Sequence, residues 1–166
     1  MTFSLPKNSP MRSTSFLYGV ATASFQIEGG VEHRLPCIWD TFCATAGKIE
    51  DGSNGDVACD HFNRWQDDVE LISSFGVDAY RLSISWPRVI KQDGTVNQQG
   101  MQFYIDLLDE LNAKGIKPFV TLYHWDLPQY LEDNGGWLNR ETAYKFQEYT
   151  KHVVKAFGDR VHAYAT

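Results

Sequence analysis

The sequence predicts an α/β fold, in which helices cover a parallel β-sheet. Four apolar runs rich in β-branched residues recur along the chain and are typical of buried strands. They are Phe16–Ser24, Val77–Ser85, Ile116–Tyr123 and Val161–Thr166. A segment with helical periodicity lies between each run and the next. Strands that alternate with helices indicate a parallel sheet, because a helix supplies the crossover between parallel neighbours.

Each of the three predicted helices begins after a capping residue and ends before a glycine. The pairs are Asp60 and Gly76, Asn97 and Gly115, and Asn139 and Gly158. Between these limits apolar residues repeat every three or four positions, as in Phe62, Trp65, Val69 and Ile72. One face of each helix is therefore expected to pack on the sheet.

Two architectures, an open doubly wound sheet and a (β/α)-barrel, can be distinguished by the connection between the first strand and the first helix. This connection runs from Phe25 to about Cys59. An open, doubly wound sheet usually carries a glycine-rich phosphate loop here, within a unit of about 30 residues. This connection is longer, and Gly29-Gly30 lacks the spacing of that loop. Long loops after strands are typical of (β/α)-barrels, whose sites lie at the carboxyl ends of the strands.

Composition narrows the function classes. The chain has 166 residues, 43% of them hydrophobic and 14% aromatic, and a formal net charge of −6 without a basic cluster. This pattern argues against nucleic acid as a partner. With no apolar run of signal or membrane-span length, we expect a cytoplasmic protein with no membrane partner. The spacing of Cys37, Cys43 and Cys59 favours free thiols over disulfides or a metal site, including one at Cys59-Asp60-His61.

Polar and aromatic side chains gather where the predicted strands end. Gln26 and Glu28 follow the first strand, and His124, Trp125 and Asp126 follow the third. Amide and imidazole groups hydrogen-bond hydroxyls, and indole faces stack on the apolar face of a pyranose. These strand ends favour a neutral polyhydroxyl ligand.

The same segments carry a family resemblance. The stretch Phe16–Gly29, FLYGVATASFQIEG, resembles the amino-terminal signature of glycoside hydrolase family 1, the β-glucosidase family. Further segments resemble that family in its order: Asp56–Phe62, Tyr80–Arg88, Leu122–Pro128 and Gly135–Trp137. Asn63 departs from the family's frequent second His. The ordered series is far more specific than any one segment.

The resemblance implies a (β/α)8 TIM barrel that hydrolyses β-linked glucosides or related glycosides with retention of configuration and without cofactor or metal. Such enzymes use two carboxylates about 5–5.5 Å apart. The family places its acid/base Glu a few residues beyond the position of Thr166 and its nucleophile much later, so no catalytic residue is assigned here. We expect 1–15 to be a polar segment and 16–166 to be the amino-terminal part of one barrel, since a barrel needs about 250 residues.

The resemblance also implies roles for four residues. Gln26 and His124 match ligands of sugar hydroxyls, and Trp125 matches a wall of the sugar site. Arg81 matches a cation that lowers the pKa of the nucleophile. The alternatives are a loop amide for Gln26, a core histidine for His124, core packing for Trp125 and a structural ion pair for Arg81. Without the nucleophile, Arg81 would be a buried cation seeking another partner.

Glu28 and Asp126 are expected to support their loops through hydrogen bonds rather than to form the catalytic pair. The isolated chain is therefore expected to be inactive.

Two other functions stay open at this stage. Because the catalytic carboxylates are absent, the chain could be a non-catalytic fragment or a sugar-binding module. The other function is that of an NAD-type nucleotide-binding domain, although the chain lacks the glycine loop of such domains. Four parallel strands leave two open edges, which favours a second chain carrying the rest of the barrel, self-association or poor solubility. The expected ligand is a small-molecule glycoside or oligosaccharide.

Overall fold

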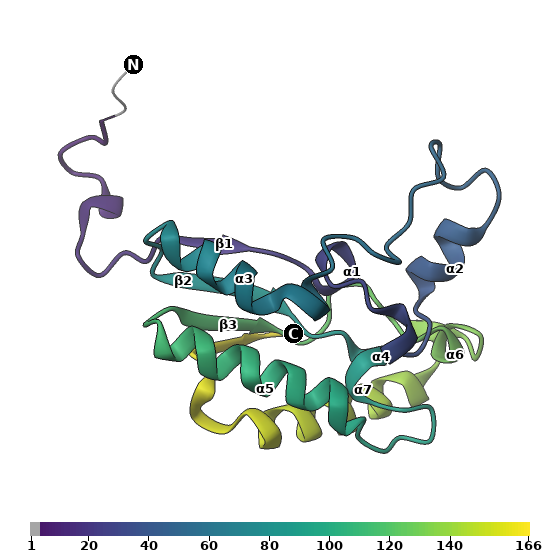
Figure 1. The fold of residues 1–166 in the computed structure, drawn as a ribbon. Helices are drawn as coiled ribbons and strands as arrows, with labels where there is room; N and C mark the ends of the chain where they lie inside the picture. The colour runs from purple at the N-terminus through teal and green to yellow at the C-terminus, as the bar shows by residue number, and fades with distance from the viewer. Residues whose placement is uncertain (1–3) are drawn as a thin grey trace.

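The computed structural model describes residues 4–166 and contains a four-stranded parallel sheet (Figure 1). Its strands are hydrogen-bonded in chain order: β1 (Gly19–Ala21), β2 (Ala79–Ser83), β3 (Lys117–Thr121) and β4 (Ala163–Ala165). Each crossover returns the chain beside the strand it has just left. The α/β prediction is confirmed, although each strand is shorter than the apolar run that predicted it.

Three long helices connect the strands and lie along one side of the sheet (Figure 1). They are α3 (His61–Ser74), α5 (Gln98–Ala113) and α7 (Arg140–Phe157), which confirms all three predicted helices. Asn139 caps α7, since its side chain accepts a hydrogen bond from the backbone N–H of Glu141 at 3.0 Å.

Two predicted caps are wrong in their bonding. Asp60 and Asn97 do precede their helices, but neither side chain accepts a helix N–H within the described structure. The Asn97 amide donates to the carbonyl of Arg88 at 2.8 Å instead, which ties the start of α5 to the preceding loop. At Asn97 this contact with the preceding loop takes the place of the helix cap.

The other helical segments are short and lie in the connections. They are α1 (Ser24–Ile27), α2 (Ile38–Ala44), α4 (Trp86–Val89) and α6 (Gln129–Glu132), with 3-10 turns at Pro10–Arg12, Val31–His33, Gly136–Leu138 and Gly158–Arg160. After β1 the chain projects away from the sheet through α2 (Figure 1). It returns where the Cys59 N–H donates to the Ile27 carbonyl at 3.2 Å.

The two faces of the sheet are covered unequally. Tyr80, Leu82 and Val120 are buried in the core formed with the helices. Alternate residues face the other way, and there Ala21 and its lateral neighbour Arg81 are exposed. The helix-covered face holds the core, and the opposite face stays accessible in the described chain.

The ends of the sheet are open within residues 4–166. β1 and β4 each pair with a single strand. The flanking helices also expose large apolar side chains, among them Phe75 at the end of α3 and Val154 on α7. The unpaired strands agree with the expected open edges.

The predicted polar segment 1–15 contains one 3-10 turn in its described part, and residues 1–3 lie outside the described residues. From residue 4 to residue 166, no helix has both the length and the apolar character that a bilayer crossing requires.

Candidate functional site

Ser24 ties three strand ends together at the carboxyl edge of the sheet. Its N–H donates to Ser83 Oγ at 2.8 Å, at the end of β2. Its own hydroxyl donates to Asp126 Oδ2, beyond β3, at 2.9 Å. All three residues are buried. Buried hydrogen bonds fix geometry firmly, because breaking one leaves a polar group without water. The loops that carry Gln26 and His124 are therefore held at one edge.

Gln26 lies in α1, two residues from Ser24, and its side chain is exposed. Within residues 4–166 its amide makes no hydrogen bond to another part of the chain, whereas the neighbouring Ser24 makes several. The amide offers a donor and an acceptor to a ligand. In the alternative, the Gln26 amide would hydrogen-bond backbone groups of its loop, and the described structure contains no such bond.

His124 and Trp125 form a stacked pair, with ring centroids 5.5 Å apart and planes 3° apart. His124 is half-buried, and Trp125 is 62% exposed. Trp125 also has a φ of +73°, a conformation that non-glycine residues adopt only at a cost. Trp125 is therefore not a core residue, and its indole lies at the surface beside His124.

Asp126, the next residue, is 1% exposed. Burial raises its pKa to about 6, and the negative charge of Glu28 contributes, while the Ser24 hydrogen bond works in the opposite direction. Oδ1 of Asp126 has no hydrogen-bond partner among the described residues. Asp126 lines a small cavity together with Ser24, Cys37 and Ser85.

Glu28 belongs to a second buried group. Arg88 Nε donates to Glu28 Oε2 at 2.8 Å, and the Tyr104 hydroxyl donates to Oε1. Arg88 is fully buried, and its Nη2 also donates to the Gly29 carbonyl at 2.7 Å. Gly29 has a φ of +61°, and a Cβ there would lie 2.3 Å from the Val57 carbonyl oxygen. Through these bonds Glu28 attaches the loop after α1 to Arg88 on α4 and to Tyr104 on α5.

The supporting roles expected for Glu28 and Asp126 agree with this geometry, although their partners are Arg88, Tyr104 and Ser24 rather than a histidine. Both carboxylates are buried and engaged in the fold.

Arg81 is not the buried cation that we expected. It lies at the centre of β2, beside Ala21 and Phe119, and is exposed. No carboxylate of residues 4–166 lies within 4.0 Å of its guanidinium, in contrast to the paired guanidinium groups of Arg88 and Arg160. The reason is the open face of the sheet, which leaves Arg81 in contact with solvent.

The edge presents hydrogen-bonding groups and a flat apolar surface side by side. Gln26 and His124 supply hydrogen-bonding groups, and Trp125 supplies a flat apolar surface. Among the described residues no cluster of three His, Cys, Asp or Glu side chains could hold a metal ion. His61, from the segment considered as a metal site, pairs instead with Asp68 at 2.6 Å.

Residues 9–166 match the sequence pattern of glycosyl hydrolase family 1. The chain belongs to this family. A β-glucosidase of Agrobacterium sp. is 53% identical to it over 154 residues, which are 91% of this chain and 34% of that protein. The crystal structure of a family 1 β-glucosidase from Exiguobacterium antarcticum superposes with a TM-score of 0.90 at 45% identity, over 93% of this chain and 35% of that one.

A third family 1 relative is the β-glucosidase of Thermotoga maritima, solved in complex with a methoxycarbonyl-substituted glucoimidazole. It has a TM-score of 0.89 and 52% identity, over 93% of this chain and 36% of that one. The chain therefore spans about a third of the length of the relatives it matches. It carries the first four strands of the family 1 TIM barrel, as predicted.

Sequence reasoning missed the groups that hold the site together. Arg88, Ser24 and Ser83 all lie within the segments that resemble the family, but the sequence assigns none of them a role. The available signal was a charged or polar residue inside an apolar segment, such as Arg88 between Trp86 and Val89. Such a residue, once buried, requires a partner.

Proposed function

We propose that the protein containing this chain is a retaining β-glucosidase, to which the chain contributes part of the glycone site. One observation supports this most strongly: the buried Ser24–Asp126 hydrogen bond joins the two loops that carry Gln26 and His124. Both side chains then offer hydrogen-bonding groups at one edge, beside the exposed Trp125. The β-glucosidase relatives, one of them bound to a glucoimidazole, support the same activity.

In this proposal the chemistry needs a nucleophile and an acid/base carboxylate about 5–5.5 Å apart. Glu28 and Asp126 are unsuited to these roles because both are buried and hydrogen-bonded within the fold. The reacting carboxylates come from segments outside this chain. The isolated chain is then inactive.

Arg81 has a supporting role in the proposed reaction. Its exposed guanidinium has no carboxylate within 4.0 Å in residues 4–166, so it is free to face one from another segment. A neighbouring cation lowers the pKa of a carboxyl group and keeps it ionised as a nucleophile.

A second candidate function is sugar binding without catalysis. The observation that favours it is the commitment of both candidate carboxylates to buried contacts, which leaves the edge with binding groups alone. Turnover by the pure chain would exclude this function. Saturable binding without turnover in any assembled form would support it.

The open strands and the apolar residues on α3 and α7 favour a partner for this chain. We propose that it is either the remaining part of the barrel or a second copy of the chain, acting on a glycoside or oligosaccharide in the cytoplasm. Light scattering tests this directly. A monomer of the chain that stays soluble at high concentration would contradict it.

The decisive experiment compares hydrolysis of a chromogenic β-glucoside by two samples. One is the chain alone, and the other is the chain co-expressed with the carboxyl-terminal two-thirds of the Thermotoga maritima β-glucosidase. Activity only in the assembled sample is the expected result. An assembled, folded complex without activity would contradict the proposal.

A further inference from the structure

The chain contains two Asn-Gly pairs, Asn54-Gly55 and Asn134-Gly135. The first lies in the loop that projects from the sheet after α2 (Figure 1), and the second lies between α6 and α7. Both asparagines are exposed. An asparagine followed by glycine is prone to deamidation, because glycine has no side chain to hinder attack by its backbone nitrogen on the asparagine amide carbon. The two pairs share this chemistry and differ in their surroundings.

The Asn54 side chain is folded over the peptide bond that follows it. Its Oδ1 accepts a hydrogen bond from the backbone N–H of Asp56 at 3.1 Å, which is the Asx turn that asparagine often makes in loops. This turn holds the amide carbon Cγ of Asn54 close to the Gly55 nitrogen, and such proximity lowers the entropic cost of attack. The Asp56 N–H also points at the oxygen on which negative charge develops during attack.

Gly55 supplies the nucleophile for this attack. Its backbone N–H makes no hydrogen bond within residues 4–166, in contrast to that of Gly135. The Nδ2 of Asn54 also donates to no group of the described chain, so no bond holds the nitrogen that must leave. Because Asn54 is exposed, water reaches its side chain. The first pair therefore has every group that deamidation requires.

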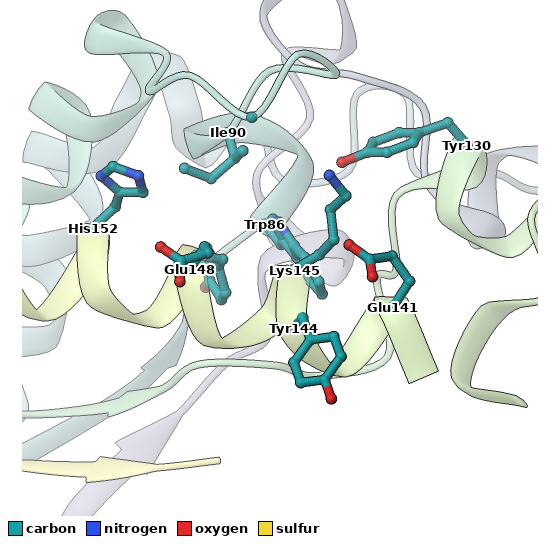
Figure 2. A pocket seen from close by; sticks show the side chains of 10 residues that line it. Trp86, Ile90, Tyr130, Glu141, Tyr144, Lys145, Glu148 and His152 are labelled. Carbon is teal, nitrogen blue, oxygen red and sulfur yellow. The ribbon is translucent and has the colours of Figure 1, made fainter. Parts of the chain in front are cut away.

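The second pair is held by hydrogen bonds on both sides of the reacting bond. The Gly135 N–H donates to the Glu132 carbonyl at 2.8 Å, and Asn134 Nδ2 donates to the Tyr130 carbonyl at 2.6 Å. Tyr130 belongs to α6, and Figure 2 shows its ring at one end of the cleft between α6 and α7. The Asn134 carbonyl accepts a further bond from Asn139 at 2.8 Å. Attack would break the first two bonds, which raises its barrier.

We propose that Asn54 is a deamidation site of the folded chain and that the fold protects Asn134. The Gly55 nitrogen loses its proton to hydroxide and forms a bond to Cγ of Asn54. The bond from Cγ to Nδ2 then breaks, and the nitrogen takes a proton from water and leaves as ammonia. Water opens the resulting succinimide to aspartate or isoaspartate. No oxidant or reductant takes part.

The modification lies beside the strand-end site. Isoaspartate adds a methylene carbon to the backbone directly before Gly55. The Phe25 ring packs closely on Gly55, since a Cβ there would lie 2.8 Å from the ring. Phe25 precedes Gln26 in α1. The inference concerns the loop itself and does not depend on the proposed function.

The test incubates the intact 166-residue chain at mildly alkaline pH and follows both Asn-Gly peptides by proteolysis and mass spectrometry. We expect the acid form of the Asn54 peptide to accumulate at least about tenfold faster than that of the Asn134 peptide. It should appear as two chromatographic species, aspartate and isoaspartate. Equal rates, or a faster reaction at Asn134, would overturn the proposal.

The same incubation in concentrated guanidinium chloride separates the effect of the fold from that of the sequence. Unfolding removes the hydrogen bonds of Gly135 and Asn134, so the rate at Asn134 should rise toward that at Asn54. A difference that persists in the denaturant would show that flanking residues set the rates, and would overturn the proposal.

A variant locates the reaction. Asn54→Gln should abolish the fast conversion, because the longer side chain would have to close a larger and less favoured ring. The Asn134 peptide should be unaffected. The exposed position of Asn54 allows this change without loss of folding. Fast formation of the acid form in Asn54→Gln would place the reaction at another residue and contradict the proposal.

Discussion

Adjacent residues at the strand-end site have opposite environments. Trp125 is 62% exposed, whereas Asp126 is 1% exposed. Gln26 is likewise exposed, and Glu28, two residues later, is buried with Arg88. We call Gln26, Trp125 and the half-buried His124 the exposed row, because the side chains of all three lack buried hydrogen-bond partners in residues 4–166. Ser24, Glu28, Arg88 and Asp126 form the buried row.

The comparison shows how one short segment serves both fold and function. Residues of the buried row bond to one another, Ser24 to Asp126 and Arg88 to Glu28, so they hold the backbone. In the exposed row, Gln26 and His124 keep their polar groups available because the neighbouring buried bonds already fix their backbone. Changes in the buried row should therefore lower stability, and changes in the exposed row should lower binding at nearly constant stability.

Substitution of Arg88 is expected to have the largest effect on the free energy of unfolding. Arg88→Met leaves the Glu28 carboxylate buried without its cation, and removal of one partner of a buried ion pair costs about 3–5 kcal/mol. Urea denaturation measures the loss. Arg64→Met is the matched control, because Arg64 is exposed and lies 4.0 Å from Asp67. Equal stability of the two variants would show that the buried row does not hold the fold.

The second effect depends on pH through Asp126. Its pKa is about 6 in the folded protein against an ordinary 3.8, so the folded state holds this proton more tightly than the unfolded chain. Its contribution to stability is complete below about pH 4 and is lost as the pH rises through about 6. The free energy of unfolding of the unchanged chain, taken relative to that of Asp126→Asn, should therefore fall by about 3 kcal/mol as the pH rises from about 4 to about 7.

Urea titrations at several pH values measure this difference. Asp159→Asn, at an exposed position, is the control and should show no such slope relative to the unchanged chain. A flat difference for Asp126→Asn would mean that the Asp126 carboxyl is not held in its protonated form.

The smallest stability effect concerns the backbone of Trp125. Glycine adopts a φ of +73° without steric cost, whereas alanine retains the cost because it keeps a Cβ. Trp125→Gly should therefore be more stable than Trp125→Ala by about 1 kcal/mol. Thermal melts of the two variants provide the measurement. Greater stability of the alanine variant would indicate that this segment has another conformation in solution.

The fold was largely predictable because its signals are local. Apolar periodicity and terminal glycines located α3, α5 and α7, and apolar runs located all four strands. Gln26 and Trp125 are exposed, and the roles that the family resemblance implies for them stay predictions.

Long-range bonds were not predictable in the same way. The partners Ser24 and Asp126 are 102 residues apart in sequence, and Arg88 and Glu28 are 60 apart. No periodicity encodes such pairs. The exposure of Arg81 was also unexpected, since it depends on whether another segment covers that face of the sheet.

The most direct test of the division between the two rows is Gln26→Ala in the assembled enzyme described above. Its kcat/KM for a chromogenic β-glucoside should fall at least about tenfold, because a hydrogen-bonding group of the proposed glycone site is lost. Its unfolding free energy should stay within about 0.5 kcal/mol of the unchanged protein. Unchanged kcat/KM, or a loss of activity that merely follows unfolding, would contradict the account.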